Sequence, residues 1–181
     1  MEFLDEIKQR IPDYAKDVRL NLDAVIARSS LPQTEALGAA LAAAFAAKSD
    51  MLVSAIRSSG LLAEADVQAA LTAASIMGMT NAWYSFIDLA DDAQLKSLPA
   101  QLRMNGYQNH GGTTRRSFEV YALSASVVGK CRFCISSHVE VLRKEGVGDA
   151  ELRDIGRIAA VINSAAQVLA AELGATVGTT V

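Results

Sequence analysis

Helical periodicity constrains the fold of this chain more than any other feature, because apolar residues return every three or four positions almost throughout. Alanine fills 32 of the 181 positions and proline only three, and both frequencies favour helix. No stretch alternates like a strand for long. The sequence therefore predicts an all-α fold, a helical bundle. The five apolar stripes are Tyr14, Val18, Leu22 and Val25; Leu37, Leu41, Ala44 and Phe45; Val67, Ala70, Leu71 and Ala74; Phe118, Tyr121, Ala122, Ala125 and Val128; and Ile155, Ile158, Ala159, Ile162, Ala166, Leu169 and Ala170.

Length and charge limit the domain organisation and the partners. A chain of 181 residues favours a single domain spanning 1–181. Hydrophobic residues make up 51% and charged residues 20%, a balance that excludes a disordered tail. The net charge of -3 argues against nucleic acid as a main partner, since binding it requires a basic surface.

One uncharged segment, 67–87, is long enough to be tested as a membrane span, which needs about 20 apolar residues. It contains several polar residues, and it is predicted to be a buried core helix rather than a span. The acidic start of the chain, residues 1–6, lacks the features of a signal peptide. Two cysteines do not make a secreted disulfide scaffold, so a reducing cytoplasm is the expected location.

The chain shows signs of an internal repeat, with half-repeats at about 34–90 and 115–172. Each half has an apolar helix, a lysine followed by a small residue (Lys48-Ser49 and Lys130-Cys131), a short helix, a basic segment ending in glycine, and another helix. Chance similarity in an alanine-rich chain is the alternative. If the repeat is real, the chemistry belongs to the second half, which holds both cysteines.

Both cysteines lie in one C-x-x-C motif, Cys131 and Cys134, at the expected start of a helix. Two sulfurs about one helical turn apart can form a disulfide without large strain. A helix N-terminus and the flanking Lys130 and Arg132 lower the pKa of a thiol, because they stabilise the thiolate. This arrangement favours Cys131 as the more acidic thiol.

A histidine and a glutamate complete the candidate site. His138 follows Cys134 by four residues and therefore shares its helix face. This spacing favours Cys134 as the reactive thiol, because a neutral imidazole accepts a thiol proton. Glu119 lies on the preceding helix, and a short turn would bring its carboxylate to His138 to orient the ring. The residues alone leave open which cysteine reacts first.

Other interpretations of the motif remain. The cysteines could be small buried apolar residues, a single nucleophile paired with His138, or two zinc ligands. A zinc site would take His138 as a third ligand and either His110 or Glu119 as a fourth. Reversible dithiol chemistry accounts best for two thiols and an imidazole on one face. His110 is expected to be a solvated residue of a connecting loop at 104–114, and Trp83 and Tyr84 to be packing residues.

The motifs together resemble alkylhydroperoxidase D, a family within the carboxymuconolactone decarboxylase-like superfamily. The resemblance covers roughly residues 75–170, and the spacing E-x11-C-x2-C-x3-H is its most specific part. The segments that carry it are Met79–Asn81, Trp83-Tyr84, Leu102–Asn105, Phe118-Glu119, Cys131–Cys134 with His138, Leu142-Arg143, Gly146-Val147 and Arg157–Ile162.

The resemblance implies an all-helical fold with an internal duplication, commonly assembled into homotrimers. It implies an antioxidant thiol peroxidase that reduces hydroperoxides and also reduces a partner peroxiredoxin, the peroxidase component of the alkyl hydroperoxide reductase system. Electrons come from dihydrolipoamide on a lipoyl-bearing acyltransferase, and no bound cofactor or metal is expected. By position, Cys134 is the peroxidatic thiol that forms a sulfenic acid, Cys131 is the resolving thiol, and His138 and Glu119 form the proton relay.

Two positions depart from the family pattern. Some members have a histidine where this chain has Phe133, and some have a glutamate where it has Val139. Either change could slow direct peroxide turnover and leave dithiol exchange intact. The alternatives are a dithiol electron-transfer adaptor that does not react with peroxide, and a zinc-binding interaction module.

Overall fold

The structure is a computed structural model that describes residues 1–177, with side chains described as far as Leu173. Helices are the only regular elements of this part of the chain, as the periodicity predicted. In chain order they are η1 (Glu2–Leu4), α1 (Asp5–Gln9), η2 (Asp13–Ala15), α2 (Lys16–Ala27), α3 (Gln33–Ala46), α4 (Asp50–Ser58), α5 (Glu64–Ala90), α6 (Ala93–Ser97), α7 (Asn105–Gln108), η3 (His110–Gly112), α8 (Arg115–Gly129), α9 (Arg132–Lys144) and α10 (Asp149–Val177).

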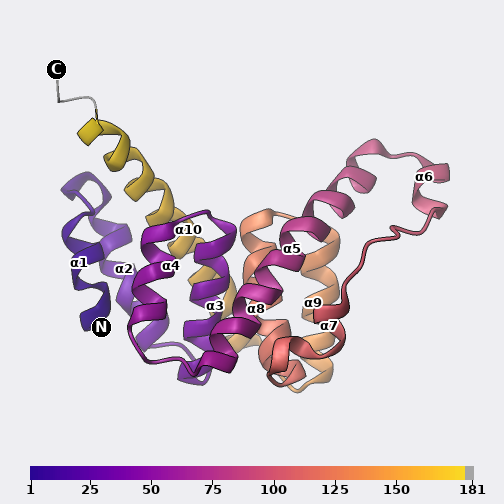
Figure 1. The fold of residues 1–181 in the computed structure, drawn as a ribbon, viewed down its shortest axis with the longest axis horizontal. Helices are drawn as coiled ribbons and strands as arrows, with labels where there is room; N and C mark the ends of the chain where they lie inside the picture. Colours follow the sequence, from indigo (N-terminus) through magenta and orange to yellow (C-terminus); the bar gives the residue numbers. More distant parts are fainter. Residues whose placement is uncertain (178–181) are drawn as a thin grey trace.

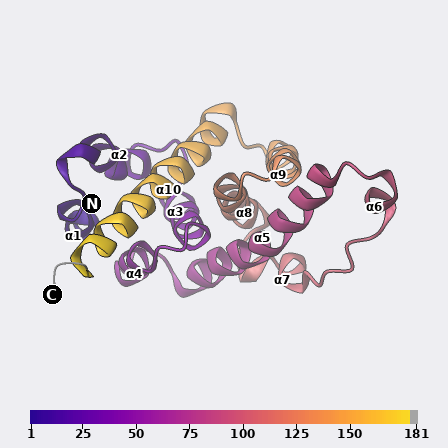
Figure 2. The same cartoon turned by 90° about the horizontal axis from the view of Figure 1, so that it is seen from above.

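Helices α3 and α8 form the centre of the molecule and pack against each other (Figure 1). The two longest helices, α5 and α10, lie on either side of this pair, and each packs against both α3 and α8 (Figure 2). Helix α4 covers α3, and α9 packs on α8 and α5. The site described below lies between α8, α9 and α5.

Small side chains bring α3 and α8 close together. Residues 36–44 of α3 are all buried, most of them alanine, so this helix is apolar around its whole circumference. A Cβ on Gly38 would lie 2.2 Å from Cε1 of the fully buried Tyr121, which means that the tyrosine ring packs directly on the glycine backbone. The Ser124 hydroxyl of α8 donates a 2.7 Å hydrogen bond to the Ala39 carbonyl across the same interface.

Three of the predicted stripes include a residue that is exposed. Tyr14 is 72% exposed, because α2 begins only at Lys16 and Tyr14 belongs to the preceding η2. Phe45 is 41% exposed at the end of α3, and Ala170 is exposed in the C-terminal part of α10. Tyr14 and Phe45 are exposed because they lie where a helix begins or ends, although the spacing predicted the buried face of each helix correctly.

The predicted connecting loop at 104–114 is in part helical. It contains α7 and η3, and three consecutive residues at His110, Gly111 and Gly112 adopt positive φ. These left-handed residues turn the chain into α8. The segment packs on α5 and carries Tyr107 to the site.

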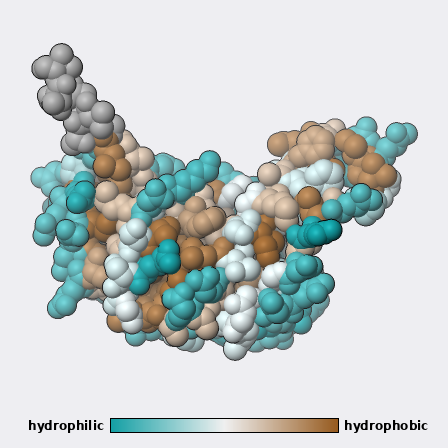
Figure 3. Space-filling view, viewed as in Figure 1, coloured by the Kyte–Doolittle hydropathy of each residue, from teal (hydrophilic) through white to brown (hydrophobic). Residues whose placement is uncertain are grey.

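The uncharged segment predicted as a core helix is buried only along its first part. Beyond Asn81, α5 is half-buried or exposed, and its last turns extend past the bundle. This part of α5 together with α6, residues 82–98, is called the arm (Figure 1). Phe86, Leu89 and Leu98 of the arm are 50%, 84% and 60% exposed, and apolar surface is visible there (Figure 3). None of the helices in residues 1–177 is both long and apolar enough to cross a membrane.

The two halves of the chain repeat one order of elements. Helix α3, a left-handed Lys48, α4, a positive-φ Gly60 and α5 are followed later by α8, a left-handed Lys130, α9, a positive-φ Gly146 and α10.

Candidate active site

The cysteine pair lies at the N-terminus of α9, as predicted. Cys131 is the N-cap residue, and its Sγ accepts a 3.2 Å hydrogen bond from the backbone N–H of Cys134. The two residues are joined by a disulfide with Cα atoms 5.3 Å apart. Both are buried. The pair is therefore held in its oxidised form, with Cys131 facing the positive end of the helix dipole.

The turn that precedes this pair depends on a close helix contact. Helix α8 runs through Gly129 and breaks one residue later, at Lys130, which has φ 55°. A Cβ on Gly129 would lie 2.2 Å from Nδ2 of Asn81. Glycine at this position therefore lets α5 approach the end of α8.

Glu119 and His138 meet as the spacing predicted. Helix α8 folds back along α9, and Oε2 of Glu119 lies 2.6 Å from Nδ1 of His138. The glutamate is 0% exposed and the histidine 5%. Burial raises the pKa of Glu119, but hydrogen bonds from His138 and Tyr107 outweigh it, and the pKa lies below its ordinary value. The pair therefore places a carboxylate in the protein interior beside an imidazole.

Two further residues contact this pair, and the sequence did not predict either. The hydroxyl of Tyr107, from α7, donates to Oε1 of Glu119. Sδ of Met77, from α5, lies 3.1 Å from Nε2 of His138. Neither is close in sequence to the cysteine motif, and Met77 follows ordinary apolar spacing in its helix. The sequence placed Met77 in the predicted core helix and Tyr107 in the predicted loop, and neither assignment linked them to the site.

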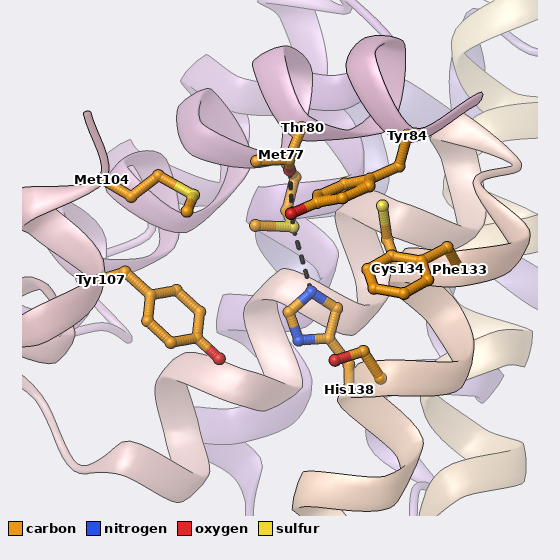
Figure 4. A pocket seen from close by; sticks show the side chains of 9 residues that line it. Met77, Thr80, Tyr84, Met104, Tyr107, Phe133, Cys134 and His138 are labelled. Atoms are coloured by element: carbon orange, nitrogen blue, oxygen red, sulfur yellow. Dashed lines mark hydrogen bonds between the residues drawn. The ribbon is translucent and has the colours of Figure 1, made fainter. Parts of the chain in front are cut away.

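Cys134 and His138 line a cavity of about 140 Å³ (Figure 4). Its walls are largely apolar, with Met77 and Tyr84 from α5 and Met104 from the segment before α7. Cys131 is not among the residues that line it. A small apolar molecule in this cavity would thus meet one sulfur of the pair, together with the imidazole.

Tyr84 and Phe133 stack at this cavity, with ring centroids 4.4 Å apart. Tyr84 was predicted to be a packing residue, and it also forms the wall of the cavity. Phe133, where some members of the resembled family have histidine, is 55% exposed. Trp83 packs on Phe86 within the arm, as a packing residue should. His110 is half-buried, with its ring 6.1 Å from that of Phe118, and does not line the cavity.

The zinc-site interpretation requires that several ligand side chains lie close enough together to bind one metal ion. Within the described residues, no group of three or more histidine, cysteine, aspartate or glutamate side chains is placed to hold a metal ion. Glu119, one proposed ligand, has its two oxygens engaged by Tyr107 and His138.

Comparison with known proteins places the chain in a family. A model of the carboxymuconolactone decarboxylase family matches residues 93–176. The chain is 42% identical over 171 residues to an alkyl hydroperoxide reductase AhpD of Rhodospirillum centenum, which covers 93% of this chain and 91% of the relative. It is 39% identical to AhpD of Coxiella burnetii, over 91% of this chain and 96% of the relative, and 37% identical to AhpD of Brucella canis, over 93% and 97%. The chain belongs to the AhpD family.

Membership of the AhpD family confirms the resemblance found in the sequence. The relatives cover more than nine tenths of the chain, so the similarity extends well beyond the cysteine motif. The carboxymuconolactone decarboxylase match extends from α6 into α10 and includes Glu119, Cys131, Cys134 and His138.

Proposed function

We propose that this protein is a hydroperoxide reductase of the alkyl hydroperoxide reductase system and that it works through the Cys131–Cys134 pair. One observation carries the proposal: a dithiol pair at disulfide distance has one sulfur on a cavity that also contains the imidazole of a buried Glu–His pair. The names of its AhpD relatives support the same activity.

The proposed reaction begins at Cys134. His138, oriented by Glu119, accepts the thiol proton directly or through a water. The thiolate attacks an oxygen of the hydroperoxide, the O–O bond breaks, and the products are a sulfenic acid and an alcohol that has taken up the proton. The Cys131 thiol then condenses with the sulfenic acid, which forms the disulfide and releases water.

Access and electrostatics together support this division of roles. Cys134 lines the cavity, so it is the sulfur that a bound hydroperoxide meets. Cys131 is 1% exposed and accepts the N–H of Cys134 at the start of α9. That environment stabilises a Cys131 thiolate, which makes Cys131 the better leaving group when a reductant attacks Cys134.

We further propose that dihydrolipoamide on a lipoyl-bearing acyltransferase re-reduces the pair by thiol–disulfide exchange. The same dithiol would pass electrons to a partner peroxiredoxin, the peroxidase component of the alkyl hydroperoxide reductase system. These steps need no resident cofactor or metal. A dithiol that must be reduced in every cycle fits a reducing compartment such as the cytoplasm.

A second candidate function is a dithiol adaptor that transfers electrons from the lipoyl group to the peroxiredoxin without reacting with peroxide. The aromatic stack of Tyr84 and Phe133 at a cavity of about 140 Å³ favours it, because this stack narrows the route for a bulky hydroperoxide.

We also propose that the protein self-associates, as a homotrimer, through the arm at 82–98. The arm contacts α9 through Tyr84 and Asp88, but its Phe86, Leu89 and Leu98 remain exposed and form an apolar surface. The repeated element order of α3–α5 and α8–α10 supports an internal duplication in which only the second half keeps the cysteines.

The direct test is a peroxidase assay in which dihydrolipoamide is the electron donor and cumene hydroperoxide the substrate, run on the wild type and on Cys131→Ser and Cys134→Ser. Sustained turnover by the wild type and its loss in both variants is the expected result. Wild-type disulfide reduction by dihydrolipoamide without peroxide consumption would favour the adaptor. No dithiol oxidation or reduction in either half-reaction would overturn both candidates.

A further inference from the structure

Tyr107 reaches the candidate site from a segment that carries none of its other polar residues. Helix α7 is only four residues long, and its tyrosine hydroxyl donates to Oε1 of Glu119. The other carboxylate oxygen, Oε2, lies 2.6 Å from Nδ1 of His138. The two hydrogen bonds together fix the plane of the carboxylate.

We propose that Tyr107 is a positioning residue of the proton relay: its hydroxyl keeps Glu119 ionised and aims Oε2 at His138. Its effect on peroxide chemistry rests on the proposed function, whereas its effect on thiol reactivity does not.

Because Glu119 is buried, its protonation state depends on the hydrogen bond from Tyr107. Glu119 is 0% exposed, so bulk water cannot replace a lost donor at Oε1. An ionised oxygen left without a donor inside a protein is strongly disfavoured, and the group takes up a proton instead. Loss of the Tyr107 hydroxyl therefore favours neutral Glu119, and a neutral Glu119 no longer stabilises a positive charge on His138.

The ionisable groups that act on Glu119 come from three elements. His138 of α9 and Tyr107 of α7 donate to it, and Arg115 in the first turn of α8 acts on it through space. Helix α5 presents Met77, Thr80 and Tyr84 to the same cavity; Tyr84 is the ionisable one of the three, and its ring stacks on Phe133. Burial and the neighbouring Glu119 both raise the pKa of Tyr107, so this residue stays a neutral donor over the whole working range of pH.

A purely structural role for Tyr107 is the competing explanation. Its ring packs edge-on against Phe118, with centroids 5.5 Å apart, and lines the cavity. Tyr107→Phe keeps this ring and removes only the hydroxyl. Tyr14→Phe is the matched control, because the Tyr14 hydroxyl also donates to a glutamate, Glu172, but Tyr14 does not line the cavity.

The test measures how fast iodoacetamide alkylates Cys134 in the reduced full-length protein across a range of pH, with the site identified by peptide mass. We expect Tyr107→Phe to move the acid limb of this profile to higher pH by about one unit, which is about a tenfold lower rate at a given pH on that limb. Tyr14→Phe should follow the wild-type profile. Circular dichroism checks that each variant keeps its helices.

A double variant tests whether Tyr107 acts through Glu119. Because Glu119→Gln already removes the charge, adding Tyr107→Phe to it should cause no further loss of rate. An unshifted acid limb in Tyr107→Phe, an equal shift in Tyr14→Phe, or additive losses in the double variant would each overturn the proposal. A wild-type protein inert toward hydroperoxide but showing the Tyr107→Phe shift would overturn the peroxidase function and leave this role standing.

Discussion

Glu119 brings a negative charge into a part of the bundle that solvent does not reach. Its oxygens face Tyr107 and His138, and these contacts hold its pKa below the ordinary value against the effect of burial. A carboxylate in this position orients the imidazole and stabilises its cationic form after it takes a proton.

Glu119→Gln should lower kcat/KM for peroxide reduction about a hundredfold, a typical contribution of positioned acid–base groups. The amide keeps the shape but cannot stabilise the imidazolium. The measurement is the dihydrolipoamide-driven assay. Glu140→Gln is the control, because Glu140 is exposed on the same helix as His138 and pairs only with Lys144. Equal activity of the two variants would show that the buried charge has no part in the reaction.

Spacing along the sequence was sufficient to predict contacts within α9 and across the turn from α8. The C-x-x-C motif, the fourth-residue offset to His138 and the position of Glu119 all follow from helix geometry. Tyr107 and Met77 could not be predicted in this way, because their contacts depend on how α7 and α5 pack in three dimensions. Phe133 was noted as a departure, but its stack on Tyr84 depends on that same packing.

At the scale of elements, a buried aspartate ties the start of α10 to the segment after α2. Asp154 is 1% exposed and accepts the backbone N–H and the hydroxyl of Ser30, both at 2.8 Å. Burial raises its pKa, but these bonds and those from Arg153 and Arg157 outweigh it and depress the pKa far below 3.8.

Asp154→Asn should therefore lower the free energy of unfolding by about 2 kcal/mol at pH 7, as expected for charged hydrogen bonds. Because the folded pKa is depressed, this stabilisation is present above pH 3.8, the ordinary value, and is lost as the pH falls through the folded pKa. Urea unfolding at pH 7 and at successively lower pH checks it. If the difference in the free energy of unfolding between wild type and Asp154→Asn stays constant as the pH falls below 3.8, this account is contradicted.

The contact of α3 with α8 gives a second prediction at this scale. Gly38→Ala should destabilise the protein by about 1–3 kcal/mol, because the new Cβ meets the ring of the fully buried Tyr121. Gly156→Ala in α10 is the control: no atom lies within 4 Å of its Cβ, and alanine favours helix. Thermal unfolding of both variants is the measurement, and equal stability of the two would argue against the close contact.

Helix positions were predictable because periodicity depends on local geometry, whereas helix ends were not. Tyr14 and Phe45 were assigned to buried stripes, but one precedes α2 and the other ends α3, so both are exposed. The segment 104–114 was predicted as a loop from its glycines. Its short helices form because α5 and α8 provide surfaces to pack against.

At the scale of the whole molecule, the arm gives the prediction about assembly. If the arm mediates self-association, Leu89→Arg should reduce the sedimenting mass toward that of a monomer, since a charge would be buried at the interface. Leu20→Arg is the control, because Leu20 of α2 is also exposed, at 61%. Sedimentation velocity distinguishes the two, and an unchanged mass for Leu89→Arg would rule out the arm as the contact.

The all-helical architecture followed from composition and periodicity, but the shape of the molecule did not. Residues 67–87 lack charge along their whole length, so the sequence did not distinguish the buried first part of α5 from the arm. The pattern within one helix cannot show where its neighbours end, and α3 and α8 end before α5 does (Figure 1).

The most direct test of the central claim identifies the cysteine that the hydroperoxide oxidises first. Reduced Cys131→Ser and Cys134→Ser proteins are each mixed with one equivalent of cumene hydroperoxide, and dimedone traps the sulfenic acid that forms. Mass spectrometry of the peptides identifies the labelled sulfur. The account predicts a dimedone adduct on Cys134 in Cys131→Ser and no rapid oxidation of Cys134→Ser. An adduct formed as fast on Cys131, or none in either variant while the wild type reacts, would contradict it.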